Sequence, residues 1–396
     1  MDKPYYENDS DMSLLPFSYV SRSVLREPSK FAQKVVGSAM VVFLVIGAGA
    51  FNGGMDRMLR ETGNPRNVLF IGAGSEESVE RSEIPMRSEG LIEAGVRGIS
   101  QRMGTYAVSG EVQYMSNLGL EDGSVGQGLL RGVTPKVFEV RREVRMVEGR
   151  FPGSGEVMVG VLAHHALGTG PGSLAVGQSL MFEGQQFRIS GRFDAPGSLL
   201  ESEVWFTRGD LMTLTQRETL SCVIVRLDRT EDFRSADLFS KQRLDLELVA
   251  LRESDYYKQL SVFYRPIRWM TWLTTALVAI GALFGGLNLL YASYASRIRE
   301  FAALRTLGFS SLSIVFTLIQ ESLLTTLAGT WIALALAAVV FADRVVFFSI
   351  GSFSLTLDGG LLAVALATGF LMGVLGTLPP AYRCLGTHLP TALRTS

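Results

Sequence analysis

The chain has 396 residues, of which 47% are hydrophobic and only 19% are charged. Ordinary soluble domains carry about 25% charged residues, so this deficit predicts long uncharged segments of the kind that cross membranes. The formal net charge of −1 gives no electrostatic basis for a nucleic-acid partner. Two cysteines in a chain of this length provide neither a disulfide framework nor a zinc motif.

A helix needs about 20 mostly apolar residues to cross a bilayer. Four segments meet this requirement: residues 35–55, 269–296, 309–342 and 359–382. A single run of this kind is also compatible with a buried helix of a soluble protein. Four such runs favour an α-helical membrane bundle of four transmembrane helices.

Glu321 is the one ionisable residue deep inside a predicted span. A charge at the bilayer centre costs about 2.5–3.5 kcal/mol on insertion scales, so this side chain must face protein or water, or be neutral. Two interpretations stay open. Glu321 is either part of a substrate or coupling path, or a hydrogen-bonded packing residue near the inner third of its helix.

Basic residues gather at one end of the predicted spans, which predicts that this end is cytoplasmic. They lie before the first span, between the second and third, and after the fourth: Arg22, Arg26, Lys30, Lys34; Arg297, Arg299, Arg305; and Arg383, Arg394. The turn of residues 343–358 holds only Arg344. We therefore expect residues 1–34, 297–308 and 383–396 in the cytoplasm, and residues 56–268 outside.

Residues 1–34 are expected to include a short amphipathic helix on the inner membrane surface. Phe17, Val20 and Val24 recur at helical spacing, and polar or basic side chains take the other side. A disordered basic lead-in is the alternative. Within the spans, three pairs of glycines four residues apart predict close approach of helices, in a bundle or a dimer: Gly49 and Gly53, Gly281 and Gly285, Gly369 and Gly373.

Residues 56–268 are too long and too rich in charge for a loop, and they predict a folded mixed α/β domain, possibly of two lobes. The segment GQSLMFEGQQFRISGRFD predicts a hairpin that turns at Glu183–Gln186. The stretch from Asp232 to Phe263 shows mixed helical periodicity. Further apolar runs predict strands, as in NVLFIGAG, EVQYMSNLGL, KVFEVRREVRMVEGR, SEVWFT and SCVIVRL, while GEVMVGVLAHHAL predicts a strand followed by a helix.

Catalytic patterns are missing from the sequence. His164 and His165 are adjacent, and neighbours on a helix do not face the same ligand. There is no Gly-x-Ser-x-Gly elbow, and GTGPGSLAVG lacks the Gly-Lys-Ser/Thr ending of a phosphate-binding loop. We therefore expect no catalytic residue, metal or cofactor, and no ATP hydrolysis by the chain itself.

The segment SRIREFAALRTLGFSSLSIVFTLIQESLLTTLAG, Ser296 to Gly329, resembles the signature of the MacB/FtsX-like permeases of ABC transporters. In that family a cytoplasmic helix with the pattern Arg-Glu-apolar-small-x-apolar-Arg-x-apolar-Gly follows the second span. The matching residues here are Arg299, Glu300, Phe301, Ala302, Leu304, Arg305, Leu307 and Gly308. Three other stretches resemble the family in the same order along the chain: LPFSYVSRSVLREPSKF, RGVTPKVFEVRREVRMVEGRFPGSGEVMVG and PPAYRCLGTHLPTALR.

The resemblance implies that residues 297–308 form a coupling helix that docks on an ABC ATPase. Apolar Phe301, Leu304 and Leu307 fall at helical spacing, and they would enter a groove of the partner with Arg299, Glu300 and Arg305 at the rim. Gly308 would end the helix. From composition alone, a surface loop with positive-inside arginines is an equal alternative. Phe301 stands where the family often has a smaller aliphatic residue, which would tune the fit to a particular ATPase.

The resemblance also implies a permease subunit of a bacterial cytoplasmic membrane. Its partners would be two copies of a separate ABC ATPase, a second permease copy that is identical or paralogous, a periplasmic adaptor or substrate-receiving protein, and the lipid bilayer. ATP-driven motion would pass outward by mechanotransmission to export or extract substrates such as lipoproteins, antibiotics, peptides or glycolipids. The alternative is a membrane-anchored sensor or scaffold, or a regulator of cell-wall enzymes, that acts through its external domain.

Overall fold

The computed structural model describes residues 19–20, 26, 28–342, 344–348 and 351–385. The chain forms two compact units. One is helical and consists of Met1–Asn52, Ile267–Ala342 and Thr356–Ser396. The other has mixed α/β structure and consists of Gly53–Pro266 and Asp343–Leu355.

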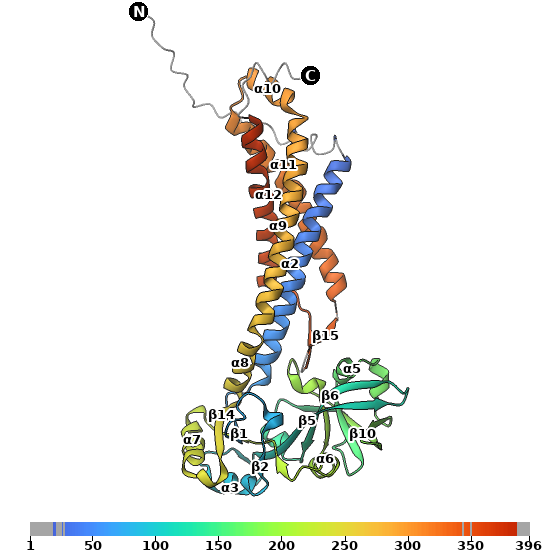
Figure 1. Cartoon of the computed structure of the whole chain (residues 1–396), viewed down its shortest axis with the longest axis vertical. Helices are drawn as coiled ribbons and strands as arrows, with labels where there is room; N and C mark the ends of the chain where they lie inside the picture. The colour runs from blue at the N-terminus through green and yellow to red at the C-terminus, as the bar shows by residue number, and fades with distance from the viewer. Residues whose placement is uncertain (1–18, 21–25, 27, 343, 349–350, 386–396) are drawn as a thin grey trace, which may run out of the picture. The chain divides into compact units, whose positions relative to one another are not determined.

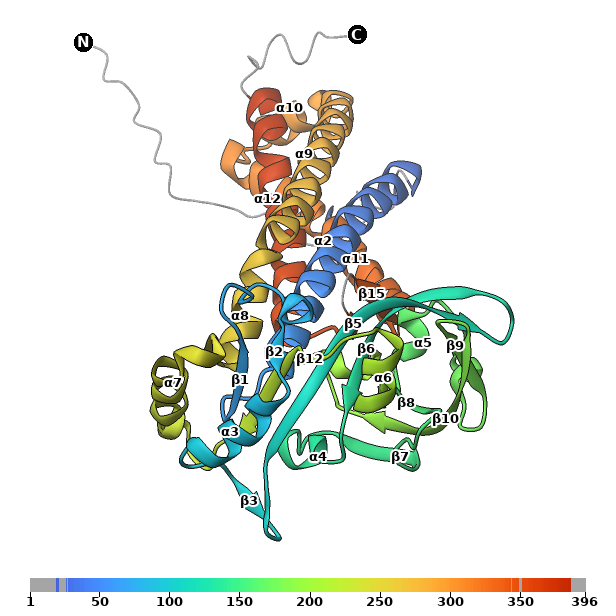
Figure 2. The same ribbon diagram turned by 60° about the horizontal axis from the view of Figure 1, so that its bottom comes forward.

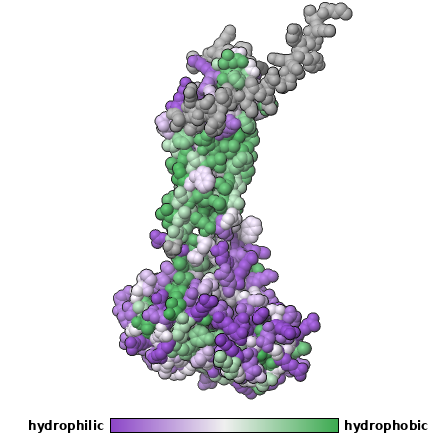
Figure 3. Space-filling view, turned by 180° about the vertical axis from the view of Figure 1, so that it is seen from behind, coloured by the Kyte–Doolittle hydropathy of each residue, from purple (hydrophilic) through white to green (hydrophobic). Residues whose placement is uncertain are grey.

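Four long helices dominate the helical unit (Figure 1): α2 (Pro28–Thr62), α9 (Arg265–Ala295), α11 (Ser311–Phe341) and α12 (Gly359–Leu385). Each is long and apolar enough to cross a membrane by length and composition. Each overlaps one of the four predicted spans. Their surface is almost continuously hydrophobic, as Figure 3 shows, because few charged residues interrupt these segments.

Glycines place α11 against two of its neighbours. A side chain at Gly329 would lie 2.6 Å from the Val35 carbonyl oxygen of α2, and one at Gly369 would collide with the Thr330 side chain of α11. The predicted pair Gly369 and Gly373 therefore lies at a helix contact. The pair Gly281 and Gly285 of α9 has nothing within 4 Å, and the pair in α2 is split, since Gly49 meets Leu361 but Gly53 meets nothing.

Most of the predicted N-terminal amphipathic helix lies outside the described residues. Tyr19, Val20 and Arg26 are described and helical, and α2 begins at Pro28, seven residues before the predicted span. At the other end, α12 continues through Pro379 and Pro380 to Leu385. The rest of the closing segment, residues 386–396, is also outside the described part.

The mixed unit is built on one ten-stranded sheet with the order β14-β1-β13-β5-β6-β11-β8-β10-β7, while β9 pairs with β10 and β5. Its strands are β1 (Asn67–Gly72), β5 (Val108–Leu120), β6 (Val125–Val133), β7 (Arg145–Gly149), β8 (Glu156–Gly160), β9 (Ser179–Phe182), β10 (Gln185–Asp194), β11 (Val204–Thr207), β13 (Cys222–Arg226) and β14 (Leu248–Arg252). Short pairs lie beside it: β2 (Ile84–Pro85) with β12 (Thr219–Leu220), and β3 (Gln101–Arg102) with β4 (Thr105–Tyr106). The expected α/β character of the external domain is confirmed.

The long strand β5 joins the two halves of this sheet, as Figure 2 shows. Its first residues pair with β13, with Val108 opposite Val225, and its later residues pair with β6, with Val112 opposite Gly132. Because one strand carries both ladders, the sheet is continuous. Whether its halves act as two lobes remains a prediction.

Helices cover this sheet or connect its strands. They are α3 (Arg87–Gly95), α4 (Val137–Val140), α5 (Ala163–Ala166), α6 (Arg208–Leu214), α7 (Phe233–Gln242) and α8 (Glu253–Phe263). Phe70, Phe182, Trp205 and Phe206 are among the largest fully buried side chains between these elements. The described part of residues 343–358 adds a small hairpin, β15 (Val345–Phe348) with β16 (Gly351–Ser354), to the same unit.

The predicted hairpin is confirmed as β9 and β10. Glu183 and Gly184 both take positive φ, 47° and 73°, as a tight turn between twisted strands requires. Two local predictions are wrong. The apolar run at Val137–Val140 is the short helix α4, and Leu248–Arg252, which we expected to be helical, is the edge strand β14, held by pairing with β1.

Candidate coupling site

The segment between α9 and α11 folds as a short helix, α10 (Ile298–Thr306). Gly308 follows it with φ of +94°, a left-handed conformation that glycine adopts without strain and that ends the helix. Ser310 then caps α11, since its side chain accepts a hydrogen bond from the Ser313 backbone N–H. The sequence therefore sets two sharp helix boundaries within a few residues.

The two faces of α10 differ. Phe301 is only 3% exposed and packs in a cluster with Leu290 and Tyr294 of α9 and with Ile314 of α11. On the opposite face, Arg299, Ala303, Thr306 and Leu307 are exposed, Leu307 by 75%. The expected docking face of Phe301, Leu304 and Leu307 therefore needs correction, because Phe301 points into the bundle and Leu304 packs against the same cluster.

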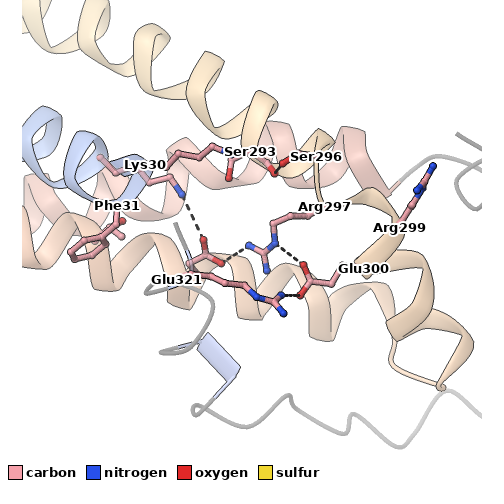
Figure 4. A pocket seen from close by; sticks show the side chains of 11 residues that line it. Lys30, Phe31, Ser293, Ser296, Arg297, Arg299, Glu300 and Glu321 are labelled. Atoms are coloured by element: carbon pink, nitrogen blue, oxygen red, sulfur yellow. Dashed lines mark hydrogen bonds and ion pairs between the residues drawn. The ribbon is translucent and has the colours of Figure 1, made fainter. Parts of the chain in front are cut away.

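Arg297 lies just before α10 and bridges two carboxylates, as Figure 4 shows. Its Nη1 donates to Glu321 Oε2 at 2.8 Å, and its Nε donates to Glu300 Oε2 at 2.9 Å. Lys34 Nζ of α2 lies 3.6 Å from the other oxygen of Glu321. One guanidinium thus links the start of α10 to the middle of α11, and Glu321 extends the link to α2.

Glu300 is the second acid of this network. It accepts a 2.5 Å hydrogen bond from the Tyr19 hydroxyl and lies 3.9 Å from Arg26 Nη1. Burial alone would raise the pKa of Glu300, but the hydrogen bonds from Tyr19 and Arg297 hold it below its ordinary value. Burial and the Glu300 carboxylate raise the pKa of Tyr19 to about 12. Glu300 therefore serves an internal contact, which corrects the expectation that its charge lies at the rim of a docking face.

Glu321 is nearly buried, and its ion pair with Arg297 explains how α11 accommodates a charge. A buried ion pair is held mainly by geometry, because desolvation offsets most of the Coulombic attraction. The contact is compatible with both interpretations of Glu321, as a packing residue and as part of a coupling path.

A second ion network lies inside the mixed unit. Arg131, 1% exposed, donates through Nε to Glu203 Oε2 at 2.6 Å and through Nη1 to Glu111 Oε2 at 2.6 Å. Arg141 Nη1 donates to Glu253 Oε1 at 2.7 Å. These residues are scattered between positions 111 and 253, so no local sequence pattern could have brought them together. The alternation of polar and apolar residues along β5 and β6 was the only signal available.

Glu253 connects this network to the segment that directly follows α2. Its Oε2 accepts hydrogen bonds from the Asn64 backbone N–H at 3.2 Å and from Asn67 Nδ2 at 2.8 Å. Glu253 is also the first residue of α8, which leads to α9. The buried Glu253 carboxylate therefore contacts the segment that follows α2 and the ion network of the sheet, and it lies at the start of the helix that leads to α9.

Within the described residues, no group of three or more histidine, cysteine or acidic side chains could hold a metal ion. His164 and His165 lie with ring centroids 4.0 Å apart, and His164 Nδ1 contacts the Val161 carbonyl oxygen at 3.0 Å. Burial lowers the pKa of both imidazoles.

Comparison with known families decides the assignment. A model described as "MacB-like periplasmic core domain" matches residues 35–237, just over half of the chain. The chain belongs to the MacB/FtsX-like permease family. A second model, "FtsX-like permease C-terminal", matches residues 272–389, which include α10 and Glu321. The resemblance drawn from the sequence motifs is therefore confirmed.

Three solved structures are similar to parts of this MacB/FtsX-like chain. The periplasmic region of MacB from Actinobacillus actinomycetemcomitans is 14% identical, with a TM-score of 0.38, and the match covers 51% of this chain and 94% of that one. The extracellular domain of the transporter YknZ from Gram-positive bacteria is 15% identical, with a TM-score of 0.35 and coverage of 47% and 99%. A domain of a putative permease protein from Porphyromonas gingivalis is 13% identical, with a TM-score of 0.32 and coverage of 47% and 86%. A comparison with curated proteins returned no match.

Membership in the MacB/FtsX-like family identifies an ABC transporter permease subunit and, as the general kind of partner, an ABC ATPase. The four apolar helices and the periplasmic-type core domain describe a membrane protein with an extracytoplasmic domain.

Proposed function

We propose that the chain crosses a bacterial cytoplasmic membrane four times, with α10 and both termini in the cytoplasm and the mixed unit outside. The basic residues around α10 support this orientation, because short cytoplasmic segments are enriched in lysine and arginine. The match of residues 35–237 to a periplasmic core domain supports the placement of the mixed unit outside the membrane.

In this proposal a separate ABC ATPase binds α10 and displaces it. The observation that carries it is the division of α10 into an exposed face, Ala303, Thr306 and Leu307, and a face fixed to the bundle by Phe301. A partner that docks on the exposed face moves the whole helix, because Phe301 and the Arg297 ion pairs couple it to α9 and α11. Two ATPase copies and a second permease, identical or paralogous, would complete the transporter.

The motion would then reach the external domain by mechanotransmission. The helix α2 is continuous over 35 residues, and α8 leads directly to α9. Glu253, at the start of α8, accepts hydrogen bonds from Asn64, Asn67 and Arg141, and these contacts within the mixed unit support the proposal that motion of both chain segments reaches the external sheet. Work done outside the membrane would export or extract a substrate, which an adaptor or receiving protein would accept.

The alternative is a sensor or scaffold, or a regulator of cell-wall enzymes. A cavity of about 620 Å³ in the mixed unit is compatible with it, since a ligand could enter beside Tyr256, Tyr257 and Phe263. The same cavity would serve a transporter as a substrate contact. The two functions therefore differ in what binds α10, not in the external domain.

Purification of the full chain from its native membrane tests the proposal. An ABC ATPase should accompany the wild-type chain, and Ala303→Arg should remove it by placing a bulky charge on the exposed face of α10. Val125→Arg is the matched control, because Val125 is also exposed but lies in the external domain. An ATPase that stays bound to the Ala303→Arg protein, or is absent from the wild type, would refute the assignment.

A further inference from the structure

The cavity of about 620 Å³ in the mixed unit is partly aromatic. All of its lining residues belong to this one unit. The helix α8 contributes Tyr256, Tyr257 and Phe263, and residues 76–81, between β1 and β2, contribute charged side chains. The volume suits a small molecule, and the rings offer an apolar surface against which the body of such a molecule can pack.

The buried ion network borders this cavity, because Arg131, Arg141, Glu203 and Glu253 line it. Arg131 pairs with Glu203 and with Glu111. Arg141 pairs with Glu253, and its Nε lies 3.8 Å from Glu111 Oε1. Two guanidinium groups are therefore shared among three carboxylates, and both already have partners of opposite charge. The network keeps one formal negative charge and offers no unpaired cation to an anionic ligand.

A second group of charges lies on residues 76–81, where Glu76, Glu77, Glu80 and Arg81 line the cavity. Glu76 accepts a hydrogen bond from the Gly74 backbone N–H at 3.2 Å. In the part of the chain that the structure describes, the side chains of Glu77, Glu80 and Arg81 make no hydrogen bond or ion pair. Three carboxylates against one guanidinium add two formal negative charges, so the cavity attracts a cation.

Glu80 and Tyr257 are two polar side chains that lack partners at this cavity. Burial raises the pKa of Glu80; Arg131 opposes this shift and the Glu203 carboxylate adds to it. Tyr257 is only 8% exposed, yet no group among the described residues hydrogen-bonds to its hydroxyl. Because buried polar groups are normally hydrogen-bonded, both side chains are suited to meet a polar group of a ligand.

Other classes of ligand match these groups less well. An anion would face an excess of carboxylates. A metal ion needs several converging ligands, and no group of three or more histidine, cysteine or acidic side chains in the described residues could hold one. A neutral apolar molecule would desolvate Glu80 further and leave the Tyr257 hydroxyl unpaired. An ammonium group on an apolar body meets both needs, because it donates hydrogen bonds to oxygen atoms and is attracted to aromatic rings.

We propose that this cavity binds a small organic cation, with its ammonium group beside Glu80 and its apolar body against Tyr256, Tyr257 and Phe263. That this cation is also the transported substrate rests on the proposed function; its binding to the mixed unit does not. Glu253 lines the same cavity and contacts the segment that follows α2. A bound cation would therefore lie next to the contacts that join this segment to α8.

Isothermal titration calorimetry of the full chain in detergent, without any ATPase, tests the charge preference. Three probes share a naphthyl ring and differ in charge: naphthylethylamine, naphthylethanol and naphthylacetate. The amine should bind about fivefold more tightly than the alcohol, as expected for one ion pair at a partly exposed site, and the anion should bind most weakly. Equal binding of the amine and the alcohol, or tightest binding of the anion, would overturn the proposal.

Substitutions locate the two parts of the ligand. Glu80→Gln should weaken the amine about fivefold and leave the alcohol unchanged, which also shows that the variant is folded. Phe263→Ala should weaken the amine and the alcohol alike, because it removes part of the apolar surface that both share. Glu218→Gln is the matched control, since Glu218 is an exposed acid of the same unit that does not line the cavity.

The probes also partition into detergent, but they do so equally for every variant, so differences between variants report on the protein. If Glu80→Gln binds the amine as tightly as the wild type, or if Glu218→Gln weakens it as much as Glu80→Gln does, the cavity is not the binding site. Because no ATPase is present, these results are independent of ATPase co-purification. Failure of either proposal would leave the other standing.

Discussion

Arg297 is the residue on which the geometry around α10 depends. It holds Glu321 on one side and Glu300 on the other, and it stacks near Phe301 with its guanidinium carbon 5.3 Å from the ring centroid. Removing an ion-pair partner from a low-dielectric site costs more than the pair contributes, because the remaining charge stays desolvated.

Arg297→Met should therefore lower the free energy of unfolding by about 3–5 kcal/mol, since Glu321 loses its closest ion-pair contact. The double variant Arg297→Met with Glu321→Met should recover much of this loss, because no desolvated carboxylate remains. Unfolding midpoints of the two proteins in detergent measure the difference. Equal destabilisation by the single and double variants would show that the loss does not come from an unpaired, desolvated Glu321 carboxylate.

A second residue gives a pH dependence to the mixed unit. Burial, and then the neighbouring Asp194 carboxyl, raises the pKa of Glu201 to about 8 from an ordinary 4.5. A raised pKa stabilises the fold below the unfolded value, and this stability is lost as pH rises through the folded value. Between about pH 4.5 and 8, the unfolded state therefore gives up this proton more readily than the native one.

Glu201→Gln should flatten this dependence, because an amide does not ionise. The wild-type chain should lose thermal stability between about pH 4.5 and 8, and the variant should lose less and melt higher at the upper end. Melting curves of the full chain in detergent check the slope. Parallel wild-type and variant profiles would mean that Glu201 ionises normally in the native state.

The residues of α10 show how far the sequence could predict the candidate site. The positions of Arg299 to Gly308 and the helix end at Gly308 were accessible from the motif. The direction of Phe301 was not, since helical spacing identifies an apolar face but not what that face contacts. The ion pair of Arg297 with Glu300 joins residues three positions apart, but the hydrogen bond from Tyr19 to Glu300 and the ion pair of Arg297 with Glu321 join residues far apart in the chain, and no local pattern reveals them.

The helices of the bundle pack through glycines only where two backbones approach. Gly329 of α11 lies against α2, where an added side-chain carbon would come within 3.0 Å of backbone atoms of Val35 and Ala39. Backbone atoms cannot rotate away as side chains do, so the helices themselves would have to separate.

Gly329→Ala should destabilise the bundle by about 1–3 kcal/mol, the usual cost of overpacking. Gly281→Ala is the control: it makes the same change in a helix of the same bundle, but its added carbon meets nothing within 4 Å. Detergent unfolding of both variants compares them directly. If Gly281→Ala proved the more harmful change, the packing of α11 against α2 would need revision.

Some helices and strands of this chain can be predicted from local sequence, and others cannot. Long apolar helices and the β9–β10 hairpin follow from hydrophobicity and turn chemistry alone. The helix α4 and the strand β14 do not, because both are short. The segment LVALR becomes a strand through its hydrogen bonds to β1, a partner more than 170 residues earlier in the chain.

At the level of the whole molecule, the proposed mechanotransmission would require a stiff connection at Glu253. Glu253→Gln keeps the shape of the side chain but removes the charge that Arg141 needs. In the assembled transporter this variant should retain ATP hydrolysis and lose transport. The ATPase subunits would still hydrolyse ATP, but less of their motion would be transmitted to the external sheet. Parallel loss of both activities, or loss of neither, would argue against this connection.

Site-specific photo-cross-linking can test whether the exposed face of α10 contacts an ABC ATPase. A photoreactive residue at Leu307, which is 75% exposed, should form an adduct with an ABC ATPase in native membranes. The same group at exposed Val125 of the external domain should not. Cross-linking of the ATPase from both positions or from neither, in membranes where the ATPase co-purifies with the permease, would contradict the coupling role of α10.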